Sequence, residues 1–172
     1  YGWPEGEVPM LQFDRPFRCT MCCCCCLLNP QEMSVKDVTT QTPLGGTKME
    51  WSCPMTVCPY RRFAIFDSFA TKEFEVEVPL ACWDGCRNCC APSCFNPVLV
   101  MPIKVAGSGE EVGALESHWP GCNIRGVCGA GMANNNYAVN FPPQANAEQK
   151  ARILSALHLV DLCFFERRSN QK

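Results

Sequence analysis

Five consecutive cysteines, Cys22 to Cys26, are the residues of this sequence with the most distinctive chemistry. Consecutive Cα atoms lie about 3.8 Å apart, whereas a relaxed disulfide joins Cα atoms roughly 4.4–6.8 Å apart, so adjacent thiols make poor disulfide partners. Successive side chains of an extended chain also point to opposite faces, which prevents five neighbouring thiols from enclosing one metal ion. The run is therefore suited to separate modification of each thiol.

Cysteines near a membrane are acceptors for palmitate, and stable anchoring needs several acyl chains or one chain with basic residues nearby. We therefore expect palmitoylation in this run, with Arg15 and Arg18 supplying basic charge. The expected acceptors are Cys22, Cys23, Cys24, Cys25 and Cys26. The alternative is a cysteine-rich loop that is partly buried and unmodified.

A second cysteine cluster has a spacing compatible with zinc or an iron–sulfur centre. It consists of Cys82, Cys86, Cys89, Cys90 and Cys94. Four thiolates within so short a segment can complete a tetrahedral zinc shell. Free or acylated thiols on a cysteine-rich hairpin are the other interpretation, so zinc stays an alternative cofactor.

The composition excludes several classes of protein. A chain of 172 residues with 47% hydrophobic residues can bury a core, and its net charge of −2 does not favour nucleic acid as a partner. The contiguous thiols and the lack of an Asn-x-Ser/Thr sequon favour a reducing compartment over a disulfide scaffold. No phosphate-binding loop, dinucleotide fingerprint or nucleophile elbow occurs, so we expect no enzyme. The sequence opens Tyr-Gly-Trp-Pro without methionine or signal peptide, which indicates a fragment or a processed product.

The elements that must position these residues are predicted to be mainly β-strands. Short apolar or alternating segments are separated by Pro, Gly and Asn clusters, which is typical of a closed or sandwiched antiparallel sheet. The expected strands cover residues 32–36, 63–66, 74–78, 98–101, 112–115 and 137–141. No repeat or linker interrupts the pattern, so a single domain over residues 1–172 is expected.

A helix is predicted over residues 147 to about 166. Asn146 and Gln149 form a capping-box pattern at its start, and Ile153–Phe165 is apolar nearly all round, interrupted by Ser155, His158 and Asp161. Thirteen residues rise about 20 Å, short of the roughly 30 Å of a bilayer interior. We therefore expect a core helix enclosed by the sheet and not a membrane span, with His158 and Asp161 satisfying each other one turn apart.

Several motifs together resemble the phospholipid scramblases. They are Asp14-Arg15-Pro16-Phe17-Arg18-Cys19 with the cysteine run, the cluster Cys82 to Cys94, Gly113 to Gly121 with its His-Trp pair, and Asn140-Phe141-Pro142 before the final helix. The resemblance covers nearly the whole chain in the same order. It implies a tubby-like fold, an antiparallel barrel around a hydrophobic C-terminal helix. It also implies that further N-terminal strands of the family domain precede this segment.

The resemblance implies a function as well: energy-independent, bidirectional movement of phospholipids between bilayer leaflets, at the cytoplasmic face of the plasma membrane, with calcium as activator. The family's acidic calcium segment corresponds in this chain to residues 133–144, which contain no carboxylate. Calcium sites depend on several oxygen ligands, usually including Asp or Glu, so only a weak site is expected. Its candidate ligands are Asn134, Asn135, Asn136 and Asn140. Two further functions stay open: an acylated tubby-like adaptor that binds lipid or protein without transport, and a soluble zinc-binding protein.

Overall fold

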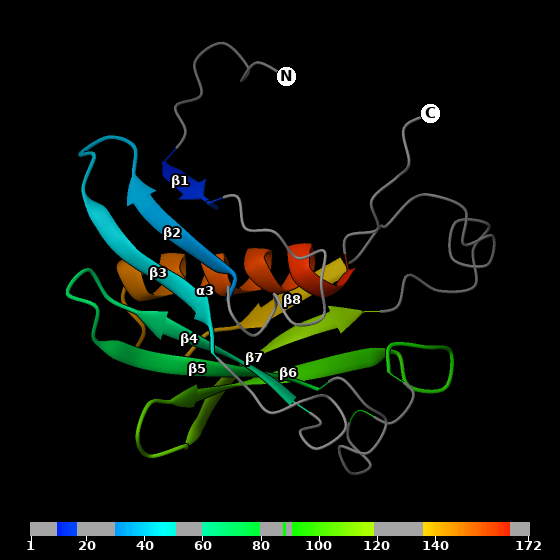
Figure 1. Ribbon diagram of the computed structural model, residues 1–172. Coiled ribbons are helices and arrows are strands. Elements are labelled where there is room, and N and C mark those ends of the chain that lie inside the picture. The colour runs from blue at the N-terminus through cyan, green and yellow to red at the C-terminus, as the bar shows by residue number, and fades with distance from the viewer. Residues whose placement is uncertain are drawn as a thin grey trace, which may run out of the picture.

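Eight antiparallel strands and one C-terminal helix form the part of the protein that the computed structural model describes, residues 10–16, 30–50, 60–79, 88, 91–118 and 136–165 (Figure 1). The strands are β1 (Leu11–Asp14), β2 (Glu32–Asp37), β3 (Pro43–Met49), β4 (Tyr60–Phe66), β5 (Lys72–Pro79), β6 (Val98–Val105), β7 (Glu111–His118) and β8 (Asn136–Asn140). The helix α3 (Ala147–Val160) continues into one π-helical turn, η1 (Asp161–Phe165).

The strands follow one another in a single meander, in the order β1 to β8, and every neighbouring pair is antiparallel. The sheet curls into a half-barrel around α3 (Figure 1). The helix packs chiefly against β2, β3 and β4. This confirms the predicted fold, a mainly β antiparallel sheet wrapped around a hydrophobic C-terminal helix.

All six expected strands are present, and five of them extend further than the pattern indicated. The last is the exception, because β8 ends at Asn140 and leaves Phe141 outside it. Two strands, β1 and β3, were not expected. The strand β3 was not predicted because it contains Gly45 and Gly46, and glycine is depleted in strands. Gly45 has φ +112°, and a Cβ there would lie 2.2 Å from the Phe66 carbonyl oxygen, so the close approach of β3 to β4 requires glycine.

The two faces of the sheet differ in chemistry as the alternating pattern predicts. On β5, Phe74, Val76 and Val78 point into the core, and Glu75 and Glu77 lie on the outer face. Although only 8% of Glu77 is exposed, its carboxylate pairs with Arg62 Nε at 3.1 Å and with Lys104 Nζ at 2.5 Å. Ion pairs therefore cover the convex face, and apolar side chains fill the concave one.

The C-terminal helix is a core element, as expected. Asn146 accepts from the Gln149 backbone N–H at 2.8 Å, and the Gln149 side chain returns the bond to the Asn146 N–H at 3.1 Å, which confirms the capping box. Ile153, Ala156, Leu159 and Val160 are fully buried. In the described part of the chain, no helix is long and apolar enough to span a bilayer.

The three polar interruptions of the helix have separate partners. Ser155 is fully buried, and its hydroxyl lies 2.7 Å from that of Thr47 on β3. Asp161 accepts a hydrogen bond of 2.5 Å from the Tyr137 hydroxyl on β8. The exposed His158 ring lies 5.0 Å from the Phe13 ring. The expected pairing of His158 with Asp161 is therefore replaced by contacts to β1 and β8, because curling of the sheet brings both edge strands to the helix.

Candidate functional site

The cysteine run lies in the connection between β1 and β2, two adjacent antiparallel strands. Cys22 to Cys26 themselves are outside the described residues. The two ends of the connection meet, since Arg15 Nη2 donates to Gln31 Oε1 at 2.8 Å and Asp14 pairs with Ser34 across the strands. The segment that carries the run therefore leaves and rejoins the sheet at one place, beside a basic side chain.

A groove of about 770 Å³ crosses the outer face next to this connection. Its lining extends from Arg15 and Pro16 to the β4–β5 turn at Asp67. Gly46 contributes no side chain, and a Cβ there would lie 2.3 Å from the Met33 carbonyl oxygen. Six charged residues of both signs line the groove: Asp14, Arg15, Glu32, Lys36, Lys48 and Asp67.

Four of the six charged residues of the groove form two ion pairs. Lys36 Nζ lies 2.9 Å from Asp14 Oδ2, and Gln12 donates to Asp14 Oδ1 at 2.8 Å. The hydrogen bonds from Lys36 and then Gln12 hold the pKa of Asp14 below its usual value. Lys48 Nζ is farther from its partner, 3.9 Å from Glu32 Oε2, and about half exposed. The groove therefore presents acidic and basic side chains to a ligand.

The second cysteine cluster is attached to the sheet through Asn88. Its side chain donates to the Val100 carbonyl at 2.9 Å and accepts from the Val100 N–H at 2.8 Å, so it pairs with β6 as a neighbouring strand would. Cys82, Cys86, Cys89 and Cys90 lie outside the described residues, and Cys94 is exposed. Among the residues that are described, no three His, Cys, Asp or Glu side chains come together as metal ligands. Zinc binding by the cluster remains a prediction.

The expected calcium ligands are only partly described. Asn134 and Asn135 lie outside the described residues. Asn136 opens β8 opposite His118, and the Asn140 amide donates to Glu116 Oε1 at 2.7 Å. Glu116 is a carboxylate that sequence reasoning missed, because it comes from β7 and not from the segment itself. It also lies 3.0 Å from His118 Nε2, so its two oxygens already have partners.

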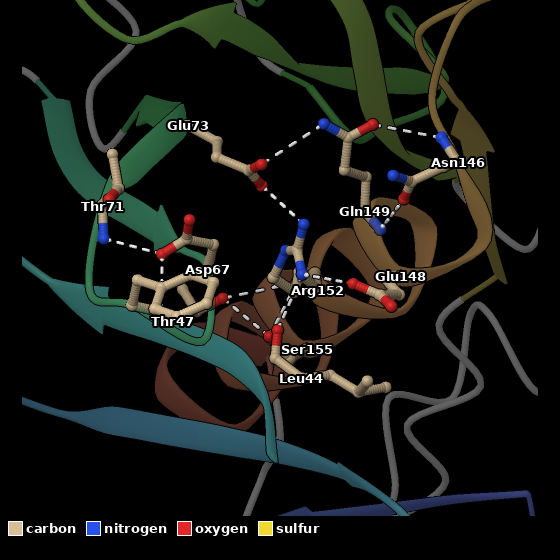
Figure 2. A network of polar contacts seen from close by, with 11 residues as sticks. Leu44, Thr47, Asp67, Thr71, Glu73, Asn146, Glu148, Gln149, Arg152 and Ser155 are labelled. Atoms are coloured by element: carbon tan, nitrogen blue, oxygen red, sulfur yellow. Dashed lines mark hydrogen bonds and ion pairs between the residues drawn. The ribbon is translucent and has the colours of Figure 1, made fainter. Parts of the chain in front are cut away.

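A buried polar network near the N-terminal end of α3 was also not predicted from the sequence (Figure 2). Arg152, which in the sequence simply flanks the apolar run, has a side chain only 4% exposed. Its Nη2 lies 2.8 Å from Glu73 Oε2 on β5, and its Nη1 donates to the Leu44 carbonyl at 2.7 Å. Glu148, one helical turn earlier, lies 3.6 Å from Nη1, and this i, i+4 pair is the one signal visible in the sequence.

Comparisons with known proteins agree with the motifs. The family described as Scramblase matches residues 6–167. Human phospholipid scramblase 2 is 26% identical over 160 residues, covering 92% of this chain and 46% of the relative. Mouse phospholipid scramblase 1 is 24% identical over 164 residues, covering 95% of this chain and 43% of the relative. The chain thus spans less than half the length of these curated relatives, and no solved structure matches it significantly.

The family match covers every described strand and the helix. On that match, the chain belongs to the Scramblase family.

Proposed function

We propose that this chain is a membrane-associated scramblase, which moves phospholipids in both directions between leaflets without an energy source and without chemical conversion. The observation that carries the proposal is the family match over residues 6–167, together with relatives named phospholipid scramblases. Its partners are then membrane phospholipids, and its place is the cytoplasmic face of the plasma membrane.

The cysteine run supplies the anchor in this proposal. The thiolates of Cys22 to Cys26 attack acyl-coenzyme A thioesters, and each transfer forms a new thioester and releases coenzyme A with the thiol proton. Several chains are needed, because one acyl chain gives only marginal binding. The contact between Arg15 and Gln31 supports this role because it places both ends of the connection that carries the run at one point of the sheet.

The outer groove is our candidate for contact with lipid headgroups. Its volume of about 770 Å³ is within the range of small-ligand sites, and its acidic and basic side chains suit a headgroup that carries phosphate and ammonium. On the concave face, the described side chains of Phe63, Ile65 and Leu115 are fully buried and apolar, so they offer a headgroup no polar contact. A headgroup that follows the outer groove avoids this core.

Lipid movement is tested by reconstituting the full, acylated chain into liposomes with a fluorescent phospholipid. A surface reductant then bleaches the outer-leaflet probe, and the later decay reports exchange between leaflets. Wild type is expected to accelerate the decay, and Lys48→Glu to slow it. The matched control is Lys150→Glu, since Lys150 is also exposed but lies on α3, outside the groove. If wild type does not accelerate the decay, the proposed lipid movement is wrong. If both variants slow the decay equally, the groove is not the headgroup site.

The anchor is tested separately by hydroxylamine-sensitive acyl labelling in cells. Changing Cys22 to Cys26 to serine should abolish most of the label and move the protein from membranes to the supernatant. A mutant that stays fully membrane-bound shows that the run is not the anchor.

An acylated adaptor is the second candidate, because a groove that binds headgroups tightly on one side of an apolar core would hold lipid without transport. Binding of phospholipid vesicles with no exchange between leaflets identifies it.

A zinc-binding protein would instead contain stoichiometric zinc and carry no acyl label. Calcium, if it activates the chain, is expected to bind weakly through Asn134, Asn135, Asn136 and Asn140.

A further inference from the structure

The strand directions divide the connections of the sheet into two groups. Four short turns, residues 38–42, 67–71, 106–110 and 141–146, follow β2, β4, β6 and β8 at one end, which we call the turn end. Four longer connections, residues 15–31, 50–59, 80–97 and 119–135, follow β1, β3, β5 and β7 at the opposite end, which we call the thiol end. In Figure 1 the turn end lies at the left and the thiol end at the right.

The helix runs from the turn end to the thiol end. Arg152, near its start, bonds to Leu44 at the beginning of β3, which is at the turn end. Asp161, after its last α-helical residue, bonds to Tyr137 at the beginning of β8, which is at the thiol end. The π-helical turn η1 therefore also lies at the thiol end.

In sequence, fifteen of the sixteen cysteines fall in the four connections that leave and rejoin the sheet at the thiol end, and the sixteenth falls in η1. They are Cys19 and Cys22 to Cys26 in residues 15–31, Cys53 and Cys58 in 50–59, Cys82, Cys86, Cys89, Cys90 and Cys94 in 80–97, Cys122 and Cys128 in 119–135, and Cys163 in η1. None lies in a described strand, in one of the four turns or in α3. Cys163 is partly buried and packs against the core as a small apolar residue. The other fifteen lie in sequence outside every described strand and helix, so their distribution follows the connections and not the core.

Three of the four tryptophans follow the same distribution in sequence. Trp51, Trp83 and Trp119 belong to three of the four thiol-end connections, whereas Trp3 precedes β1, which begins at the turn end. Among the described side chains, Cys94 is exposed and Phe95 next to it is 90% exposed. Tryptophan and other aromatic side chains are favoured where protein meets the membrane interface.

The charges of the two ends are opposite. The thiol-end connections carry Arg15, Arg18, Arg87 and Arg125 against Glu50 and Asp84, which gives a net charge of +2. The turn-end connections carry Asp67 and Glu110 without a basic residue, which gives −2. An anionic leaflet attracts the first end and repels the second.

We infer that the thiol end is the surface of this domain that faces a lipid bilayer, with the strands leading away from the membrane and the turn end in water. This orientation rests on the proposed membrane function and adds a direction to it. It extends the anchor from one cysteine run to the four connections that leave and rejoin the sheet at this end. It also brings the Arg15 end of the outer groove to the lipid and points the Asp67 end away from it.

Two exposed phenylalanines provide a matched test. Phe95 at the thiol end is 90% exposed and Phe69 at the turn end is 87% exposed, and each tolerates a surface substitution. The variants Phe95→Trp and Phe69→Trp of the full, acylated chain are reconstituted into phosphatidylcholine–phosphatidylserine vesicles with and without brominated acyl chains. Bromine quenches tryptophan on contact, and subtraction of the wild-type signal isolates the added residue.

The added fluorescence of Phe95→Trp should fall about twofold or more in brominated vesicles, because an interfacial tryptophan touches the acyl region. That of Phe69→Trp should stay unchanged. Quenching of Phe69→Trp equal to or greater than that of Phe95→Trp overturns the orientation but leaves membrane association intact. A wild-type chain that fails to sediment with the vesicles overturns the proposed function and, with it, the orientation.

Discussion

Substitution of Arg152 tests most directly which contacts hold the helix α3 against the sheet. The Arg152 guanidinium is buried between Glu73 on β5 and the Leu44 carbonyl on β3, at 2.8 and 2.7 Å. The variant Arg152→Met keeps the unbranched stem and removes the charge and the donors. The Leu44 carbonyl then loses its donor, and Glu73 keeps only the hydrogen bond of 3.4 Å from Gln149 Nε2.

The magnitude follows from the burial of the two ions. Removing one partner of a buried ion pair costs about 3–5 kcal/mol. The Glu73 side chain is 24% exposed, so water can partly solvate it after the change. We therefore expect Arg152→Met to lower the free energy of unfolding by about 3 kcal/mol, the low end of that range. Glu148, with a side chain 63% exposed and 3.6 Å away, should matter by less than about 1 kcal/mol.

The assay is urea unfolding followed by far-ultraviolet circular dichroism, under reducing conditions, with the slope against urea compared between variants. Glu148→Gln is the control on the same guanidinium. The double variant Arg152→Met/Glu73→Gln should recover part of the loss, since no unpaired buried carboxylate remains. If Arg152→Met is as stable as wild type, or if the two changes are simply additive, the network does not hold the helix.

Three further predictions concern the core, the β3–β4 contact and calcium. Leu157→Ala should lower the free energy of unfolding by about 2–5 kcal/mol, measured by thermal unfolding without detergent, because Leu157 lies in the core. Leu154 is only half-buried, so Leu154→Ala should lower it by less. Equal and negligible losses in both variants would contradict a core helix. Gly45→Ala should destabilise more than Gly107→Ala, since both have positive φ but a Cβ at Gly107 meets nothing within 4 Å, so the difference in urea midpoints isolates the clash with β4. Calcium titrated by calorimetry should bind in the millimolar range or weaker, and a micromolar site lost on changing Asn134 to Asn136 to alanine would refute this.

Elements with a local cause were predictable from the sequence. The alternation in Phe74 to Val78 predicts β5 because side chains alternate across a strand whatever its neighbours are. Asn146 and Gln149 predict the helix start because a capping box is closed within one turn. The strand β3 was not predictable in this way. Its Gly45 and Gly46 weaken any local strand preference. The close approaches that require them, of β4 to Gly45 and of β2 to Gly46, are contacts made only in the folded sheet.

The groove and the Arg152 network could be recognised only from the folded structure. Asp14, Lys36 and Lys48 come from three strands, and only the pairing of β1, β2 and β3 brings them to one face. Arg152 and Glu73 are far apart in the sequence, and the curl of the half-barrel over α3 makes them partners.

The cysteines show the division between the two sources of information most clearly. The sequence by itself determined the chemistry of the run Cys22 to Cys26, because the spacing of adjacent Cα atoms is the same in every fold. It did not determine that the connection with this run shares one end of the sheet with the three other connections that contain cysteines. Only the tertiary structure decided that, because the uninterrupted antiparallel order of the eight described strands returns every second connection to the same end of the sheet.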